Sequence, residues 1–323
     1  MTPLTLADVE AARERIRPHL QKTPFRSYPP LDDYVGNGIR VFVKHENHQP
    51  TSAFKVRNGL SAVAALPEAE RRRGLIAAST GNHGQGVAWA GERLGAPVTI
   101  CVPLGNNPEK NRAMRGYGAR LVEEGADYDE AVQVARRLAE GEGLTTIHST
   151  NNKDVIAGAG TITLEMAEEE PDLEALVVSV GGGSQAVGAI TVMRALRPGV
   201  GVYGVQASMA RACHDSWHAG KPLEGYRSQT MADGLATRST YAFTFPALLE
   251  GLAGFVAVDE AELAEGVRRL LCLTHNLAEP AGAAGLAGVL KLRETLRGKR
   301  VGIILSGGNA DMRTLSEIIQ GRL

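Results

Sequence analysis

Short apolar segments alternate with helical segments along most of this 323-residue chain. The apolar runs occupy residues 75–78, 98–102, 118–122, 175–180, 202–205 and 301–305, and stretches with helical spacing of apolar residues occupy 86–94, 111–117, 128–138 and 187–196. Strands that alternate with helices form parallel sheets, because each helix returns the chain to the edge where the next strand begins. Such sheets bind ligands at the loops that follow their strands. We therefore expect an α/β protein whose site lies in those loops.

The composition excludes several other classes of protein. Apolar residues make up 43% and charged residues 22%, and the net charge of −1 leaves no basic surface for nucleic acid. Cys101, Cys213 and Cys272 are far apart, which argues against a disulfide framework and favours a reducing compartment. The N-terminus lacks the apolar core of a signal peptide, and no apolar run approaches the roughly 18–20 residues of a membrane span. We expect a cytoplasmic protein.

A run of three glycines, Gly181, Gly182 and Gly183, followed by Ser184, separates an apolar run from a helical stretch. Consecutive glycines allow several backbone N–H groups to converge on one anion. The helix that follows adds the partial positive charge of its N-terminus. The segment predicts a phosphate-binding loop.

The same loop also fits a dinucleotide-binding pattern. Gly181, Gly183 and Ala186 match GxGxx(G/A), which in NAD-binding proteins is followed about 20 residues later by an acidic residue at the end of the next strand. The next apolar run of this chain ends instead in Val205, Gln206 and Ala207. An NAD-linked oxidoreductase is therefore a distant alternative.

Lys55 is a second candidate, because lysine is scarce and this one stands between Phe54 and Val56 beside Thr51 and Ser52. A lysine that forms a Schiff base must first lose its proton. Lowering its pKa from about 10.4 to neutrality costs roughly 4 kcal/mol, which burial and a nearby helix N-terminus can supply. The same sequence is also typical of a surface lysine at the start of a helix. The role of Lys55 therefore depends on which other groups lie near it.

Two further polar segments directly follow apolar runs. Residues 79–86, Ser-Thr-Gly-Asn-His-Gly-Gln-Gly, offer donors to a carboxylate and to a phenolic oxygen, although an ordinary polar turn would have the same composition. Ser306, before Gly307, Gly308 and Asn309, is placed to meet a ring nitrogen. His45 and His48 form an HxxH without the glutamate and helical spacing of a zinc motif, so we expect no metal site.

In this order, the segments resemble the threonine dehydratase/serine racemase group of fold-type II pyridoxal-phosphate (PLP) enzymes. The likeness covers essentially the whole chain and includes Thr23-Pro24, residues 53–55, 79–83, 155–158, 181–184 and 232–234, Glu279-Pro280 and residues 306–309. The resemblance implies a two-domain α/β fold in which each domain is an open, mostly parallel sheet flanked by helices. Residues 1–51 plus 147–323 would form the large PLP-binding domain, and residues 52–146 a small inserted domain. It also implies a homodimer.

The resemblance further implies a role for each candidate residue. Lys55 would form the Schiff base with PLP and remove the α-proton of the substrate. The other cofactor contacts would come from Phe54 at the ring, Asn82 at the phenolic oxygen, Gly181, Gly182, Gly183 and Ser184 at the phosphate, Ser306 at the pyridine nitrogen, and Glu279 close by. Ser79, Asn82 and His83 would surround the carboxylate of the substrate.

This set of residues implies an ammonia-lyase. A neutral Ser306 does not hold a proton on the ring nitrogen as a carboxylate would, which favours prompt loss of a β-hydroxyl group. The expected reaction removes water from a small β-hydroxy amino acid such as L-threonine or L-serine and yields a 2-oxo acid and ammonia. A catalytically silent ligand-binding protein on the same fold is another alternative, which the complete set of neighbours around Lys55 argues against.

Three departures from the family pattern define further alternatives. Ser184 replaces a fourth glycine, which preserves phosphate binding because a hydroxyl also donates. Thr80 stands where racemases commonly have serine and many dehydratases alanine, so a racemase that uses Thr80 on the opposite face is an alternative. Residues 206–212 lack the Glu and Asp with which some relatives bind a divalent cation. Together with Trp217 and residues 232–237, that stretch is similar to dehydratases assigned to hydroxyectoine breakdown, whose β-hydroxy amino acid is an alternative substrate.

Overall fold

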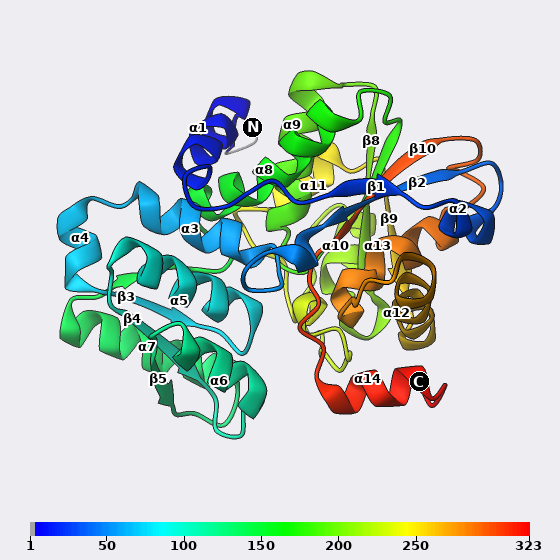
Figure 1. Cartoon of the computed structure of the whole chain (residues 1–323). Helices are drawn as coiled ribbons and strands as arrows, with labels where there is room; N and C mark the ends of the chain where they lie inside the picture. The colour runs from blue at the N-terminus through cyan, green and yellow to red at the C-terminus, as the bar shows by residue number, and fades with distance from the viewer. Residues whose placement is uncertain (1–3) are drawn as a thin grey trace.

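The computed structural model describes residues 4–323 and contains two sheets (Figure 1). The larger has the strand order β1-β2-β10-β7-β8-β9 and the smaller β5-β4-β3-β6. β1 is antiparallel to β2, and the other described strand pairs are parallel. The predicted fold class is therefore confirmed. The strands are β1 (Phe25–Ser27), β2 (Arg40–His45), β3 (Leu75–Ala78), β4 (Val98–Val102), β5 (Arg120–Glu123), β6 (Thr145–Thr146), β7 (Ala175–Ser179), β8 (Gly201–Ala207), β9 (Gly254–Val258) and β10 (Arg300–Leu305).

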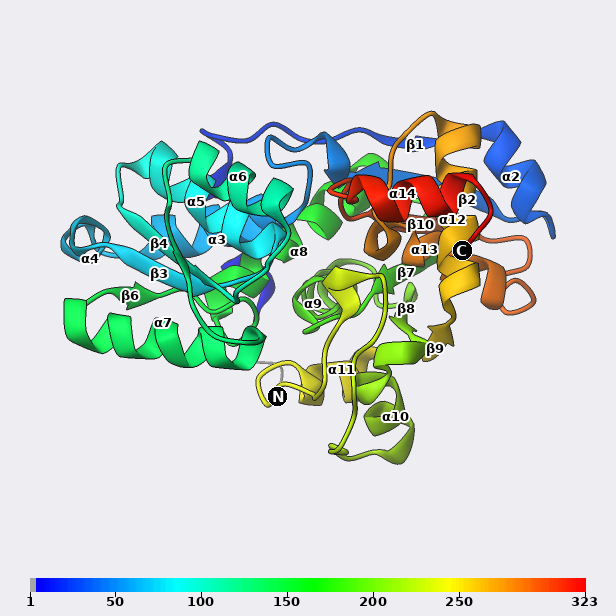
Figure 2. The same cartoon turned by 90° about the horizontal axis from the view of Figure 1, so that it is seen from below.

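Helices cover both faces of the larger sheet. Successive side chains of a strand point to opposite faces, so Val177 and Ile303 pack in one buried cluster while Val178 and Ile304 pack in another. The first cluster lies under α2 (Pro29–Val35), α12 (Glu260–Thr274) and α13 (Pro280–Lys291). The second lies under α1 (Leu6–Ile16), α8 (Lys153–Glu169), α9 (Ser184–Leu196) and α11 (Phe245–Gly251). Seen from below, α14 (Met312–Ile319) runs across the larger lobe (Figure 2).

The smaller sheet has its own two layers of helices. Leu75 and Ala77 pack towards α3 (Lys55–Ala65), α5 (Asn82–Leu94) and α6 (Pro108–Gly116), whereas Ile76 and Ala78 pack towards α7 (Tyr128–Glu142). Its four strands lie between residues 75 and 146, inside the predicted small domain, whose boundaries stay a prediction. The remaining helices are α4 (Glu68–Arg73) and α10 (Ala212–Ala219). Among residues 4–323, no helix is long and apolar enough to cross a bilayer.

The predicted strands begin and end within two residues of the observed ones, but three helices begin three or four residues earlier than predicted. α9 begins at Ser184 rather than at residue 187, and the other two are α5 and α6. α5 begins at Asn82 rather than at residue 86, because Ser79 Oγ accepts the N–H of Gly84 and so caps the first turn. α6 begins at Pro108 rather than at residue 111, because Asn107 Oδ1 accepts two N–H groups of that turn. Five of the eight residues of the polar segment 79–86 are therefore helical.

A buried ion network fixes the start of α3 against the larger lobe. Arg57 lies between Glu46 and Glu165, with nitrogen–oxygen distances of 2.8 and 2.7 Å, and Lys44 also contacts Glu165 at 2.8 Å. α8 approaches α3 so closely that a Cβ on Gly158 would lie 2.4 Å from the Arg57 carbonyl oxygen. Because Arg57 lies two residues after Lys55, these contacts fix the backbone from which the candidate lysine extends.

Candidate active site

A short antiparallel bridge brings the start of α3 to the end of β10. Ala53 pairs with Gly307, and the N–H of Phe54 donates to the carbonyl oxygen of Ser306 at 2.9 Å. Ser306 itself is buried directly after the last strand residue. The bridge therefore places Lys55 and Ser306, which are 251 positions apart in the sequence, on adjoining segments.

Lys55 is the first residue of α3, and its ammonium group points to the neighbouring loop. Nζ donates to the carbonyl oxygen of Ser149 at 3.4 Å and lies 5.1 Å from the centre of the Phe54 ring. Burial lowers the pKa of Lys55 to about 8. At pH 7 about one lysine in ten is then neutral, compared with fewer than one in a thousand at the ordinary pKa.

The loop after β7 admits no side chain larger than hydrogen. A Cβ on Gly181 would lie 2.2 Å from the carbonyl oxygen of Gly234, and a Cβ on Gly182 would lie 2.2 Å from Thr150 Oγ1. Gly183 has φ +95°, in the region that favours glycine. The glycines are therefore required by close approach and by backbone conformation, and they leave backbone N–H groups uncovered.

The loop leads directly into α9, whose first residue is Ser184. The first N–H groups of a helix have no partner within it and carry its positive end. Asn58 Nδ2 donates to Ser184 Oγ at 3.3 Å, which leaves the hydroxyl hydrogen of Ser184 to donate elsewhere. Uncovered N–H groups, a helix N-terminus and a free hydroxyl donor fit the phosphate of PLP.

Hydrogen bonds fix the orientation of Asn82 at the start of α5. Its Oδ1 accepts from Asn309 Nδ2 at 2.8 Å, and its own Nδ2 donates to Glu279 Oε1 at 2.7 Å. Asn309 also donates to the carbonyl oxygen of Thr51 at 2.8 Å. One hydrogen on Asn82 Nδ2 is left to donate, which fits a bond to the phenolic oxygen of PLP.

Glu279 is buried immediately before α13. Burial raises its pKa to about 7, although the charge of Lys110 works in the opposite direction. A Cβ on Gly307 would lie 2.4 Å from Glu279 Oε1, so the glycine after Ser306 makes room for this carboxyl group. Glu279 is therefore held against both Asn82 and the segment that follows β10.

The segment proposed for the carboxylate of the substrate is organised around Ser79. Its Oγ accepts the N–H groups of Gly81 and Gly84 at 3.2 and 2.9 Å, which leaves the hydroxyl hydrogen free. His83 Nε2 lies 3.0 Å from the carbonyl oxygen of Ile147 and must carry the hydrogen of that bond. Burial lowers the pKa of His83 to about 3, and its Nδ1 is buried without a hydrogen-bond partner. Its place beside the substrate carboxylate stays a prediction.

Thr80 lies beside these residues and is half-buried. Asn106 Nδ2 donates to its carbonyl oxygen at 3.3 Å, which ties the segment to the start of α6. Thr80 thus belongs to the segment proposed for the carboxylate of the substrate, between Ser79 and Gly81. Its role as an acid or base stays a prediction.

The sequence patterns did not point to His148, which precedes the Ser149 that Lys55 contacts, or to Tyr241, which packs against His148. His148 Nδ1 accepts the N–H groups of Thr150 and Asn151 at 3.0 and 2.8 Å, and the charge of Lys55 adds to burial in lowering its pKa. The ring of Tyr241 lies edge-on to the ring of His148, with the two centroids 6.0 Å apart, and burial raises the pKa of Tyr241 to about 12. No sequence pattern links these residues, because they come from separate loops.

His45 is the last residue of β2, and His48 ends the 3-10 turn Glu46–His48 that follows it. The two rings stack with centroids 5.0 Å apart, and His45 Nε2 lies 2.8 Å from the hydroxyl of Tyr28. Within residues 4–323, no group of three or more His, Cys, Asp or Glu side chains is arranged to hold a metal ion. The pair is explained by packing.

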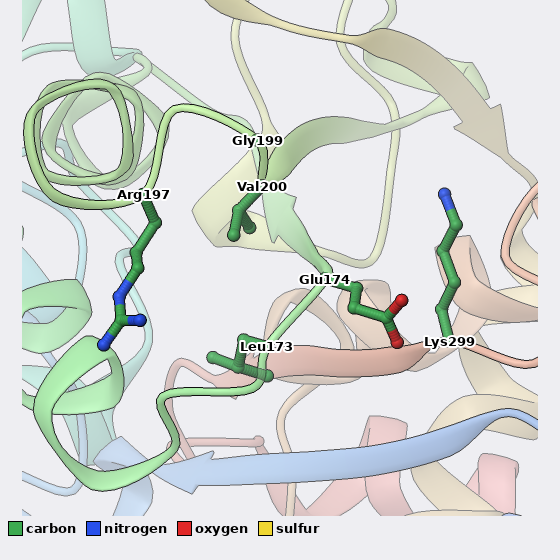
Figure 3. A pocket seen from close by; sticks show the side chains of 6 residues that line it. All are labelled: Leu173, Glu174, Arg197, Gly199, Val200 and Lys299. Atoms are coloured by element: carbon green, nitrogen blue, oxygen red, sulfur yellow. The ribbon is translucent and has the colours of Figure 1, made fainter.

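The pocket in Figure 3 lies at the opposite edge of the larger sheet. Its lining residues precede β7, β8 and β10, at the amino ends of the strands, and enclose a cavity of about 360 Å³. Loops that bind ligands in parallel sheets follow the carboxyl ends. The lining, Leu173, Glu174, Arg197, Gly199, Val200 and Lys299, is therefore not part of the candidate site.

Comparison with known proteins agrees with this geometry. The family model described as "Pyridoxal-phosphate dependent enzyme" matches residues 16–307. An L-threonine ammonia-lyase of Thermotoga maritima is 37% identical over 98% of this chain and 78% of its own length. An L-threo-3-hydroxyaspartate ammonia-lyase of a Pseudomonas species is 36% identical over 97% of this chain and 98% of its own.

A solved structure of a similar protein has the same fold as this chain. Maize serine racemase superposes with a TM-score of 0.93 and 28% identity, covering 99% of this chain and 98% of the other. Because the family model matches residues 16–307 and the Thermotoga relative aligns over 98% of this chain, the cofactor prediction is confirmed. The chain belongs to the pyridoxal-phosphate-dependent enzymes, in the threonine dehydratase/serine racemase group.

Proposed function

We propose that this enzyme is an ammonia-lyase that removes water from a small β-hydroxy amino acid such as L-threonine or L-serine, giving a 2-oxo acid and ammonia. The observation that carries the proposal is the partly buried Lys55, with a pKa lowered to about 8, joined by backbone pairing to the segment of Ser306. Two of the similar proteins described above are ammonia-lyases, which supports the same reaction class.

The residues have distinct tasks in holding PLP. Gly181, Gly182, Gly183 and Ser184 would take the phosphate, Asn82 the phenolic oxygen and Ser306 the ring nitrogen, with Phe54 beside the ring and Lys55 as the covalent attachment. When bound, PLP withdraws electrons from the α-carbon of the amino acid and so makes its proton removable. These tasks are the ones that the resemblance to the family implies, and the free donors of Asn82 and Ser184 support two of them.

Lys55 is suited to take that proton, because a pKa of about 8 keeps a usable fraction of neutral amine near neutral pH. The hydroxyl of Ser79 and the backbone N–H groups at the start of α5 would orient the carboxylate of the substrate. The neutral hydroxyl of Ser306 cannot keep the ring nitrogen protonated as a carboxylate would. Electron withdrawal by the ring is therefore limited, which favours early departure of the β-hydroxyl group over reactions that need a long-lived carbanion at the α-carbon.

The visible absorption spectrum of the purified enzyme tests the cofactor attachment. Wild type should absorb as a lysine–PLP imine, Lys55→Ala should lose that band, and Lys153→Ala, a change at an exposed lysine, should keep it. Formation of 2-oxo acid from threonine, serine, 3-hydroxyaspartate and a hydroxyectoine-derived β-hydroxy amino acid then identifies the substrate. An imine band that survives in Lys55→Ala would contradict the assignment.

A racemase is the second candidate, favoured by the similarity to maize serine racemase. Thr80 would then protonate the face of the substrate opposite Lys55. Inversion of L-serine by wild type, abolished in Thr80→Ala while elimination persists, would support it. Elimination without any inversion during turnover would exclude it.

We also propose that residues 52–146 form a small domain that closes over the substrate and that the enzyme is a cytoplasmic homodimer. The four-stranded sheet contained within that range supports the domain assignment. Light scattering of the holoenzyme would give a mass near twice 34.2 kDa if the dimer is correct. A monomer mass at micromolar concentration would contradict it.

A further inference from the structure

A buried amide joins the helix that carries Lys55 to the glycine loop. Asn58, on α3, is fully buried, and its Nδ2 donates to Ser184 Oγ at 3.3 Å across 126 positions of the sequence. The Oδ1 of the same amide is also buried and has no hydrogen-bond partner among residues 4–323. A half-satisfied amide costs stability in a protein interior, so its presence there needs a reason other than packing.

The side of α3 that carries Asn58 also carries Lys55. Residues three positions apart lie on the same side of a helix, so Asn58 stands one turn beyond the candidate lysine. Lys55 Nζ donates to the carbonyl oxygen of Ser149. The next residue, Thr150, lies against the glycine loop, because a Cβ on Gly182 would be 2.2 Å from its Oγ1. Two separate contacts therefore direct this side of α3 towards the loop after β7.

The bond from Asn58 determines what the hydroxyl of Ser184 can do. A hydroxyl has one hydrogen and two lone pairs, and an N–H that occupies one lone pair turns the hydrogen away from that donor. Ser184 is the first residue of α9, where a serine oxygen can otherwise accept nearby backbone N–H groups and so withdraw them from an anion. Asn58 thus presents Ser184 as a donor, at the position of the family's fourth glycine.

Building on the proposed function, we propose that Asn58 is a positioning residue for the phosphate of PLP and acts through Ser184. α3 would then hold the cofactor at both ends, covalently through Lys55 and at the phosphate through the bond from Asn58 to Ser184. A phosphate dianion accepts strong hydrogen bonds, so this orientation of Ser184 strengthens the binding of PLP without any contact between Asn58 and the phosphate. A cofactor analogue that lacks the phosphate would gain nothing from it.

The test is titration of the apoenzyme with PLP and with pyridoxal, which lacks the phosphate, followed by the absorbance of the imine. Ser184→Ala should bind PLP about tenfold more weakly, because a donor to a charged group is lost. Asn58→Leu, which keeps a side chain of similar size without a donor, should bind PLP about fivefold more weakly. Asn58→Ala, which only removes atoms, should show the same loss. The affinity for pyridoxal should stay at the wild-type value in all three.

Ser61→Ala is a matched control, because Ser61 is buried one turn further along α3 and faces α8, where a Cβ on Gly158 would lie 2.8 Å from its Cβ. It should bind both compounds as wild type does. The double variant Asn58→Leu/Ser184→Ala should bind PLP no more weakly than Ser184→Ala alone, because Asn58 then has no hydroxyl to orient.

Three results would overturn the inference: an equal loss of affinity for PLP and pyridoxal in the Asn58 variants, wild-type affinity for PLP in those variants or in Ser184→Ala, or a further fivefold loss when Asn58→Leu is added to Ser184→Ala. Because binding is measured rather than turnover, the outcome does not depend on which amino acid is the substrate. An imine band that survives in Lys55→Ala would instead overturn the cofactor attachment on which the inference rests.

Discussion

The glycine loop offers the sharpest prediction, because its geometry gives a magnitude. In Gly181→Ala the new Cβ would lie 2.2 Å from the carbonyl oxygen of Gly234, more than 1 Å inside ordinary van der Waals contact. The clash is with backbone, so a rotation of a side chain cannot relieve it. Overpacking of this kind costs about 1–3 kcal/mol. If the cost falls on the phosphate loop, PLP binds about 5- to 150-fold more weakly.

Titration of the apoenzyme with PLP, followed by absorbance, measures that affinity, and urea unfolding of the same samples measures any cost to the fold. Gly141→Ala is the control: this glycine lies in α7 with nothing within 4 Å of an added Cβ. Alanine there should leave PLP affinity unchanged and stabilise the helix by up to about 1 kcal/mol. If Gly181→Ala kept both the PLP affinity and the urea midpoint of wild type, the close approach to Gly234 would be refuted.

Three other perturbations test buried groups of the site and its support. Burial raises the pKa of Glu279 to about 7 from an ordinary 4.5. Between pH 4.5 and pH 7 the native apoenzyme therefore binds more protons than the unfolded chain, so its free energy of unfolding falls as the pH rises. Relative to Glu279→Gln, wild type should lose about 3 kcal/mol of unfolding free energy across that window. Arg57→Met leaves Glu46 buried without its cation and Glu165 with Lys44 alone, and should cost about 3–5 kcal/mol in urea unfolding. The pKa of about 8 for Lys55 predicts that covalent attachment of PLP to the apoenzyme speeds up with pH and levels off above about 8.

Each of these has a clear contrary result. Parallel pH profiles of stability for wild type and Glu279→Gln would show that the carboxyl group titrates normally. A cost below about 1 kcal/mol for Arg57→Met would show that the network carries little stability. An attachment rate that keeps rising to pH 10 would show an unperturbed Lys55.

The alternation of apolar runs with helical segments determined the fold class, since hydrophobic periodicity is local and survives without knowledge of partners. The strands after which Gly181 and Ser306 stand were correctly located for the same reason. The start of α5 was wrong by four residues, because the cap comes from Ser79 and depends on a hydrogen bond that composition alone does not reveal.

For the site, the sequence by itself identified the residue types that PLP chemistry requires: a scarce lysine, a glycine loop, and polar segments at strand ends. Their convergence was decided only by the tertiary structure. The bridge between Ala53 and Gly307 joins segments from opposite ends of the chain, and the contact of Asn82 with Glu279 does the same. Such contacts have no sequence signal, because they depend on how separate lobes pack and not on local periodicity.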